Sequence, residues 1–176
     1  MSRSGPLPSS LAYRLLPSQD DLESVHDLLA ASRRMFVLLE EIRQAHGLQA
    51  NVVALIDHGY HRVRDRTGLP ARLVTLGIRD FAQTSGIDPA TIASMPLDEK
   101  LFSVKSASEM ALTTLSGRRT VLYRVDGYGG PWRDASSARL FIAGDILTIQ
   151  VGVSVPAPIG ETRTMPETIL TRVGRI

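Results

Sequence analysis

The sequence predicts an α+β fold in which a small antiparallel β-barrel is interrupted by a helical insertion of three to four helices. A short apolar run at residues 11–17 comes first, and apolar side chains then recur at helical spacing from residue 18 to about residue 86. After Pro96 the spacing becomes that of strands, with turn residues between short apolar runs. An N-terminal strand has no partner among helices, so we expect residues 11–17 to pair with the later strands.

The composition limits the chemistry that this chain can perform. Its 176 residues suit one domain or two small modules that share a core. It contains no cysteine, which excludes disulfides, thiol nucleophiles and thiolate zinc sites and suits a cytoplasmic protein. No run approaches the roughly 18 apolar residues that a membrane span needs, and residues 1–13 lack the apolar core of a signal peptide. We therefore expect no membrane partner.

Cap and stop residues divide the helical part into segments. We expect helices at 18–46, 51–68 and 70–86, each bounded by a Ser or Asn cap, a proline in the first turn or a glycine stop. Residues 88–96 are expected to form a short capped turn of helix, because an Asp-Pro pair begins the segment. These segments account for the three to four helices of the insertion.

The second half of the chain predicts two hairpins. Residues 111–125 are expected to form two short strands, and residues 138–156 a hairpin that turns at 143–145. In the second strand of that hairpin, apolar and polar side chains alternate, which predicts a sheet with one buried face. Residues 126–134 are expected to form a long turn.

These elements predict a division of the chain into four parts. Residues 1–9, which are rich in Ser, Pro and Gly, are expected to be a disordered tail. The β-barrel is assigned to residues 10–17 together with 97–158, and the helical insertion to residues 18–96. Residues 159–176 are expected to be a linker or, through "TILTRV", a strand that pairs with a partner chain.

Arginine clustering provides the main functional signal. Only Lys100 and Lys105 are lysine among the 20 basic residues, and five arginines lie within residues 62–79. Guanidinium forks suit phosphate, so we expect contact with a nucleic-acid backbone. Solvated or ion-paired arginines, and a codon usage that replaces lysine throughout, are the alternatives. On projection of the third helix the polar positions form one narrow stripe, which consists of Arg72, Thr75, Arg79 and Gln83.

The remaining motifs define no catalytic or metal site. The glycine-rich segment at 127–132 lacks the strand–loop–helix context of a phosphate cradle, and a plain turn is the alternative. Tyr128 and Trp132 within it are candidates for stacking on bases. His58 and His61 lie three apart on a helix, but a metal would need a third ligand. We predict no enzyme activity and no cofactor.

The order of segments resembles that of TnpB-type proteins, the transposon-encoded RNA-guided nucleases ancestral to type V CRISPR effectors. "LAYRLLPSQDDLESVHDLLAASRRMFVLLEEI" is similar to the opening strand and helix of that family. "GLPARLVTLGIRDFA" is similar to its Leu-Pro-initiated helix in the recognition lobe, and "SARLFIAGDILTIQVGVSVP" to the strand pair that precedes its nuclease domain. Leu16 stands where the family has Tyr, and this chain contains neither the RuvC-like nuclease nor the four-cysteine zinc ribbon.

The resemblance implies a wedge-type, OB-like barrel interrupted by a helical recognition lobe. It also implies a non-catalytic subunit of an RNA-guided DNA-targeting effector in a prokaryotic cytoplasm. Its partners would be a guide RNA, a target DNA and a second protein chain with the RuvC-like nuclease, unless that half has been lost. A protein–protein adaptor with no direct nucleic-acid role is the alternative. The residues expected to contact nucleic acid are Arg14, Arg33, Arg34, Arg62, Arg64, Arg66, Arg72, Thr75, Arg79, Gln83, Arg118, Arg119, Tyr128 and Trp132.

Overall fold

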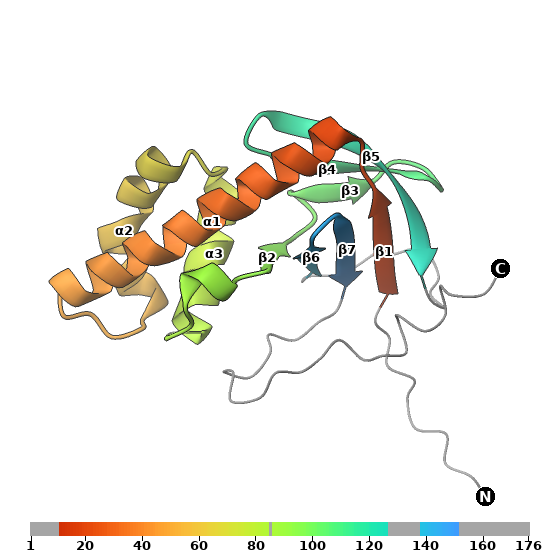
Figure 1. Ribbon diagram of the computed structural model, residues 1–176. Helices are drawn as coiled ribbons and strands as arrows, with labels where there is room; N and C mark the ends of the chain where they lie inside the picture. The colour runs from red at the N-terminus through yellow and green to blue at the C-terminus, as the bar shows by residue number, and fades with distance from the viewer. Residues whose placement is uncertain (1–10, 85, 127–137, 152–176) are drawn as a thin grey trace, which may run out of the picture.

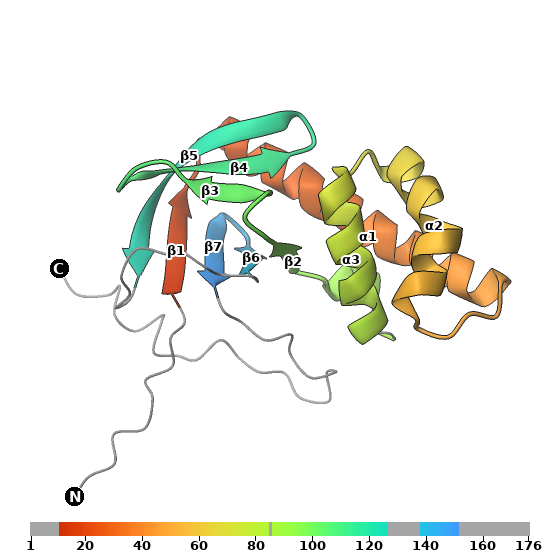
Figure 2. The same cartoon turned by 180° about the vertical axis from the view of Figure 1, so that it is seen from behind.

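The computed structural model describes residues 11–84, 86–126 and 138–151, and it has the predicted α+β fold. A curled seven-stranded antiparallel sheet forms a half-barrel, and three α-helices lie mainly to one side of it (Figures 1 and 2). The elements in chain order are β1 (Leu11–Leu16), α1 (Gln19–Ala45), α2 (Val52–Thr67), α3 (Ala71–Gln83), the 3-10 turn η1 (Pro89–Thr91), β2 (Ser94–Leu97), β3 (Phe102–Val104), β4 (Glu109–Thr114), β5 (Gly117–Asp126), β6 (Ala138–Ala143) and β7 (Ile146–Val151).

Strand β1 lies in the middle of the sheet, although it comes first in the chain. The strand order is β2-β6-β7-β1-β5-β4-β3, so β1 has β5 on one side and β7 on the other. Arg14, for example, lies opposite Arg124 of β5 and Thr148 of β7. The predicted return of the N-terminal strand to the later strands is therefore confirmed. All three α-helices follow β1 and precede the other six strands, as an insertion would.

The two edge strands were not predicted. Strand β2 overlaps the end of the segment 88–96 that was expected to be helical, and only Pro89–Thr91 of that segment forms a helical turn. Strand β2 contains Pro96, which cannot donate a ladder hydrogen bond and is therefore tolerated at a sheet edge. Only residues 98–101 connect β2 to β3 at the opposite edge, so the curled sheet brings its two edges together at this turn.

The first helix begins and ends where its capping residues predict. Ser18 accepts a hydrogen bond from the backbone of Asp21, whose carboxylate in turn accepts from Ser18, so the two form a capping box. The helix then continues for 27 residues to Ala45. Its N-terminal part lies beside the sheet and its C-terminal part lies among α2 and α3 (Figure 1).

The second and third helices also confirm their predicted boundaries to within a few residues. Asn51 caps α2 through hydrogen bonds from two backbone amides, and Gly68 ends it with a left-handed φ of 69°. Helix α3 begins just after Pro70 and ends at Gln83, three residues before the predicted stop at Gly86.

A single apolar core joins the helices to the sheet. Helices α1 and α3 cross closely at Gly77, where an added Cβ would overlap the side chain of Met35. Next to this crossing the rings of Phe36 and Phe81 meet edge to face, with centroids 5.4 Å apart. Gly59 allows α2 a similar close approach to α1, so small residues determine how closely the three helices pack.

Candidate nucleic-acid interface

The three predicted arginines of α2 do not share one face. Arg62 and Arg66 are one helical turn apart and lie on the flank toward α1, where Arg62 is 3.8 Å from the Glu41 carboxylate. Arg64 is rotated by roughly 200° from each of them, so it lies on the other flank of α2. All three side chains are exposed. The described residues offer no side-chain hydrogen bond or ion pair to Arg64 or Arg66.

The predicted stripe of α3 lies opposite the buried face of the helix, but its members differ in environment. Arg79 and Gln83 are exposed, whereas Thr75 is half-buried and donates to the backbone carbonyl of Ala71. Arg72 forms an ion pair with Asp98, a buried carboxylate in the turn between the two edge strands. Arg72 therefore connects α3 to the sheet, and a phosphate would have to compete with Asp98 for its guanidinium.

A second arginine–aspartate pair fastens α3 to the sheet and was not predicted. Arg139 of β6 donates to both carboxylate oxygens of Asp80, at 2.6 and 3.0 Å, and also to the hydroxyl of Ser94 on β2. Both charged side chains are at most one-tenth exposed. Such bidentate geometry satisfies the buried charges, which would otherwise be costly. Asp80 is thus a structural anchor and does not belong to the exposed surface.

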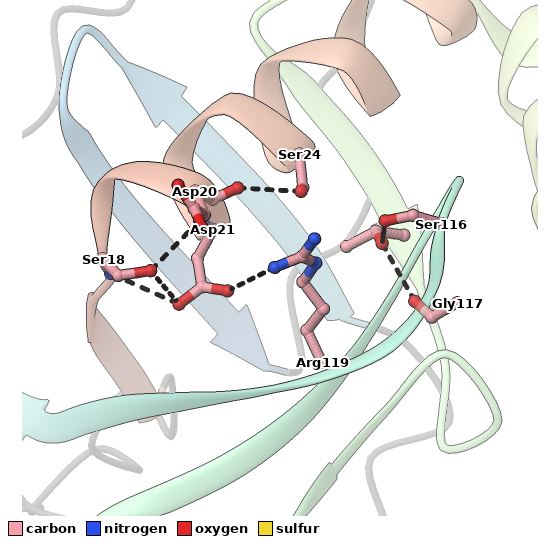
Figure 3. A network of polar contacts seen from close by, with 8 residues as sticks. Ser18, Asp20, Asp21, Ser24, Ser116, Gly117 and Arg119 are labelled. Carbon is pink, nitrogen blue, oxygen red and sulfur yellow. Dashed lines mark hydrogen bonds and ion pairs between the residues drawn. The ribbon is translucent and has the colours of Figure 1, made fainter.

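Arg119, which was expected to contact nucleic acid, faces the N-terminus of α1 instead (Figure 3). Its guanidinium lies 3.4 Å from the carboxylate of Asp21, the same residue that closes the capping box with Ser18. The contact joins β5 to the beginning of α1, which are far apart in the chain. Arg119 therefore helps to orient the long helix against the half-barrel.

The other predicted arginines fall into two groups. Arg33 donates to the carbonyl of Ile92, and Arg118 donates to the carbonyl of Lys100 and the hydroxyl of Ser103, so both have partners within the fold. Arg34 lies on the solvent side of α1, and Arg14 lies on the face of β1 opposite its buried Tyr13 and Leu15. Neither Arg34 nor Arg14 has a side-chain hydrogen bond or ion pair within the described ranges.

The structure therefore sorts the arginines by location. Arg72, Arg119 and Arg139 each bridge two elements and are paired with carboxylates, whereas Arg14 on the central strand has no partner in the described ranges. Four exposed arginines of the helical insertion have no partner in the part of the chain that the structure describes, and they are Arg34, Arg64, Arg66 and Arg79.

The sequence also offered histidines as candidate metal ligands and two aromatic residues as candidates for stacking on bases. His58 lies beside His46, with ring centroids 4.6 Å apart, while His61 contacts the ring of Tyr60. Over residues 11–84, 86–126 and 138–151, no three His, Asp or Glu side chains gather in a way that could hold a metal ion. Tyr128, Trp132, the long turn at 126–134 beyond Asp126, and the predicted strand "TILTRV" lie outside the described residues.

Neither the protein families nor the curated proteins provide a relative of this chain. No protein-family model matches it, and a search of curated proteins finds no match. Within the described ranges, none of the helices combines the length and apolar character that crossing a membrane requires.

Proposed function

We propose that this chain binds nucleic acid through the arginines on the solvent side of its helical insertion. The observation that supports this proposal is that Arg34, Arg64, Arg66 and Arg79 are exposed on the helices without a partner among the described residues, whereas Arg72, Arg119 and Arg139 pair with carboxylates. Guanidinium groups that are exposed and unpaired are available to phosphate oxygens without first breaking an internal ion pair. Such contacts hold a backbone and do not select a base sequence.

The particular form of this proposal comes from the resemblance to TnpB-type proteins. In that form the chain is a nuclease-free subunit of an RNA-guided DNA-targeting effector in a prokaryotic cytoplasm. It holds the guide RNA and the target DNA, and a second chain provides any RuvC-like cleavage. The half-barrel with a helical insertion after its first strand is compatible with a wedge and a recognition lobe.

The arrangement of the arginines suggests two contact regions. Arg62 and Arg66 lie on one flank of α2 and Arg64 on the other, so one straight strand of nucleic acid would not reach all three. Arg79 lies on the solvent face of α3, two turns from Arg72. The ion pair with Asp98 gives Arg72 a positioning role, because it holds the helix that presents Arg79.

The proposal is tested by measuring how strongly variants with arginine replaced by glutamate bind nucleic acid. Fluorescence anisotropy would measure the affinity for a labelled 20-nucleotide RNA, a DNA duplex and an RNA–DNA hybrid over a series of salt concentrations. We expect the logarithm of the association constant to fall linearly with the logarithm of salt concentration, with a slope of about −0.7 to −0.9 per phosphate contact. Changing Arg66→Glu and Arg79→Glu together should weaken binding at least tenfold and reduce the slope by about two.

The matched control uses the only two lysines. Lys100→Glu with Lys105→Glu alters the net charge equally, and both side chains are exposed on the β-part of the molecule. This control should retain most of the affinity if the arginines bind locally. If both double variants lost the same affinity for nucleic acid, the loss would follow from the change in net charge and not from local contacts. If the arginine variant bound nucleic acid unchanged, the proposed surface would be refuted.

A protein–protein adaptor is the second candidate function. The observation that favours it is the pair of exposed leucines, Leu16 and Leu122, which lie opposite each other on neighbouring strands of the half-barrel.

A further inference from the structure

Helix α2 presents two neighbouring aromatic rings at the end of the molecule away from the sheet (Figures 1 and 2). The helical insertion contains three Phe, Tyr or Trp residues, of which Phe36 and Phe81 are buried, whereas Tyr60 is only half-buried. His61 is exposed, and its ring meets the Tyr60 ring edge to face, with centroids 5.2 Å apart. We call Tyr60 and His61 the ring pair.

The geometry of the ring pair leaves aromatic surface free for a ligand. An edge-to-face contact covers one ring face and leaves the remaining faces of the two rings open to other neighbours. The hydroxyl of Tyr60 has no hydrogen-bond partner among the described residues. By contrast, the rings of His46 and His58 are 4.6 Å apart and only 33° from parallel, so they cover each other. The ring pair is therefore the better platform for a flat ligand.

An arginine without a partner lies next to the ring pair. Arg64 follows Tyr60 by four residues and His61 by three, so its side chain is one helical turn from both rings. It is exposed and has no side-chain partner within the described ranges. Asp57 and Asp65 lie one turn before and one turn after His61, and they offset the charge of Arg64. A phosphate contact alone would therefore be weak here, so binding needs a second, uncharged interaction.

We propose that the ring pair and Arg64 hold a single-stranded segment of nucleic acid, with an unpaired base stacked on the rings and a phosphate on Arg64. This inference rests on the proposed function and specifies the form of nucleic acid that α2 binds. The bases of a duplex are already stacked and paired, so only a single strand can lay a base on a side-chain ring. Stacking uses the face of the base, which every base has, so it requires no particular sequence.

Affinities for single and double strands test this proposal. Fluorescence anisotropy would measure the binding of the full-length protein to labelled oligo(dT), oligo(U) and a DNA duplex, each about 12 nucleotides long. We expect His61→Ala to weaken binding of both single strands about fivefold or more, the lower end of what one stacked base contributes, and to leave duplex binding unchanged. His61→Trp should strengthen single-strand binding, because its larger ring offers more area for stacking.

The salt dependence separates the two parts of the site. Arg64→Gln should reduce the slope of the logarithm of the association constant against the logarithm of salt concentration by about 0.7, because one phosphate contact is lost. His61→Ala should lower the affinity without changing this slope, since stacking releases no counterions. His26→Ala is the matched control, because His26 is an exposed histidine in the N-terminal part of α1, and it should leave both quantities unchanged.

A second variant tests the other ring. Tyr60 packs partly against the core, so Tyr60→Leu would keep an apolar side chain there while it removes the ring. This variant should reproduce the loss of single-strand affinity seen in His61→Ala. Circular dichroism and thermal melting would show whether each variant is folded. If Tyr60→Leu were not, the two His61 variants, at an exposed position, would still decide.

Three results would overturn the proposal: unchanged single-strand affinity in His61→Ala, an equal loss for single strand and duplex, or an equal loss in His26→Ala. The Arg66→Glu/Arg79→Glu variant reports separately on the proposed function. If it bound nucleic acid unchanged while His61→Ala lost single-strand affinity, the arginine surface would be refuted and this site would stand. The reverse pattern would leave the arginine surface and remove this site. If the unchanged protein bound none of the probes, both would be wrong.

Discussion

Removal of the Asp80 carboxylate leaves a buried guanidinium without its charge partner. Asp80 accepts two hydrogen bonds from Arg139, and the side chains are 6% and 10% exposed. In Asp80→Ala, Arg139 would retain only its contacts with the Ser94 hydroxyl. Breaking a buried ion pair from one side costs about 3–5 kcal/mol in the free energy of unfolding. That is a large part of the about 5–15 kcal/mol that stabilises a typical domain.

The same reasoning predicts a different result when both charges are removed. Asp80→Leu combined with Arg139→Met eliminates the uncompensated charge and replaces the pair with apolar side chains. We expect the double variant to be close to the unchanged protein or more stable by about 1–4 kcal/mol. Urea denaturation followed by far-ultraviolet circular dichroism would measure both free energies, with the slope m checked for constancy. A cost below about 1 kcal/mol for Asp80→Ala, or a double variant as unstable as the single, would refute the reasoning.

Three further predictions concern packing, a cap and pH. Gly77→Ala should cost no more than about 1 kcal/mol in urea denaturation, because its Cβ overlaps only the end of the flexible but buried Met35 side chain and alanine favours a helix over glycine by about 0.5–1 kcal/mol; Met35→Ala should remove that cost in a double-mutant cycle. Gly68→Ala should lower the free energy of unfolding by about 1–2 kcal/mol, since φ is 69°; an unchanged midpoint would contradict this. Hydrogen bonds from Arg43 lower the pKa of the Glu40 carboxyl, so their stabilisation is complete above the unfolded-state pKa and is lost as pH falls through the folded-state pKa. Both side chains are about one-third exposed, so Glu40→Gln should change stability by less than about 0.5 kcal/mol at neutral pH and flatten its acid dependence; a larger change would contradict this.

Local signals in the sequence were sufficient for most elements. Ser18, Asn51 and Gly68 begin or end their helices as predicted, because caps depend on side chains within a few residues. The burial of Leu147, Ile149 and Val151 was predicted correctly from their alternation with polar residues, which is also a local pattern. The return of β1 to the sheet followed from the physical need of a lone strand for partners.

The elements and contacts that were missed depend on residues distant in the chain. Strand β2 has four residues and a proline, and only its pairing with β6 makes it a strand. The arginine stripe was placed on the correct side of α3, yet the sequence did not reveal that Arg72 meets Asp98, 26 residues away. Arg139 lies between apolar residues of a buried strand, and that position is the signal that could have indicated a buried ion pair.

The central place of β1 has a consequence for synthesis of the protein on the ribosome. The strand emerges first, but β7, one of its two neighbours, is more than one hundred residues further along the chain. At about 5–20 residues per second, β1 would wait on the order of ten seconds for that partner. The segments of α1, α2 and α3 emerge during this interval and can begin to pack on one another. A chain that is cut short before β7 would contain helices able to associate but a first strand with one side of its backbone unpaired, and it should aggregate through that edge.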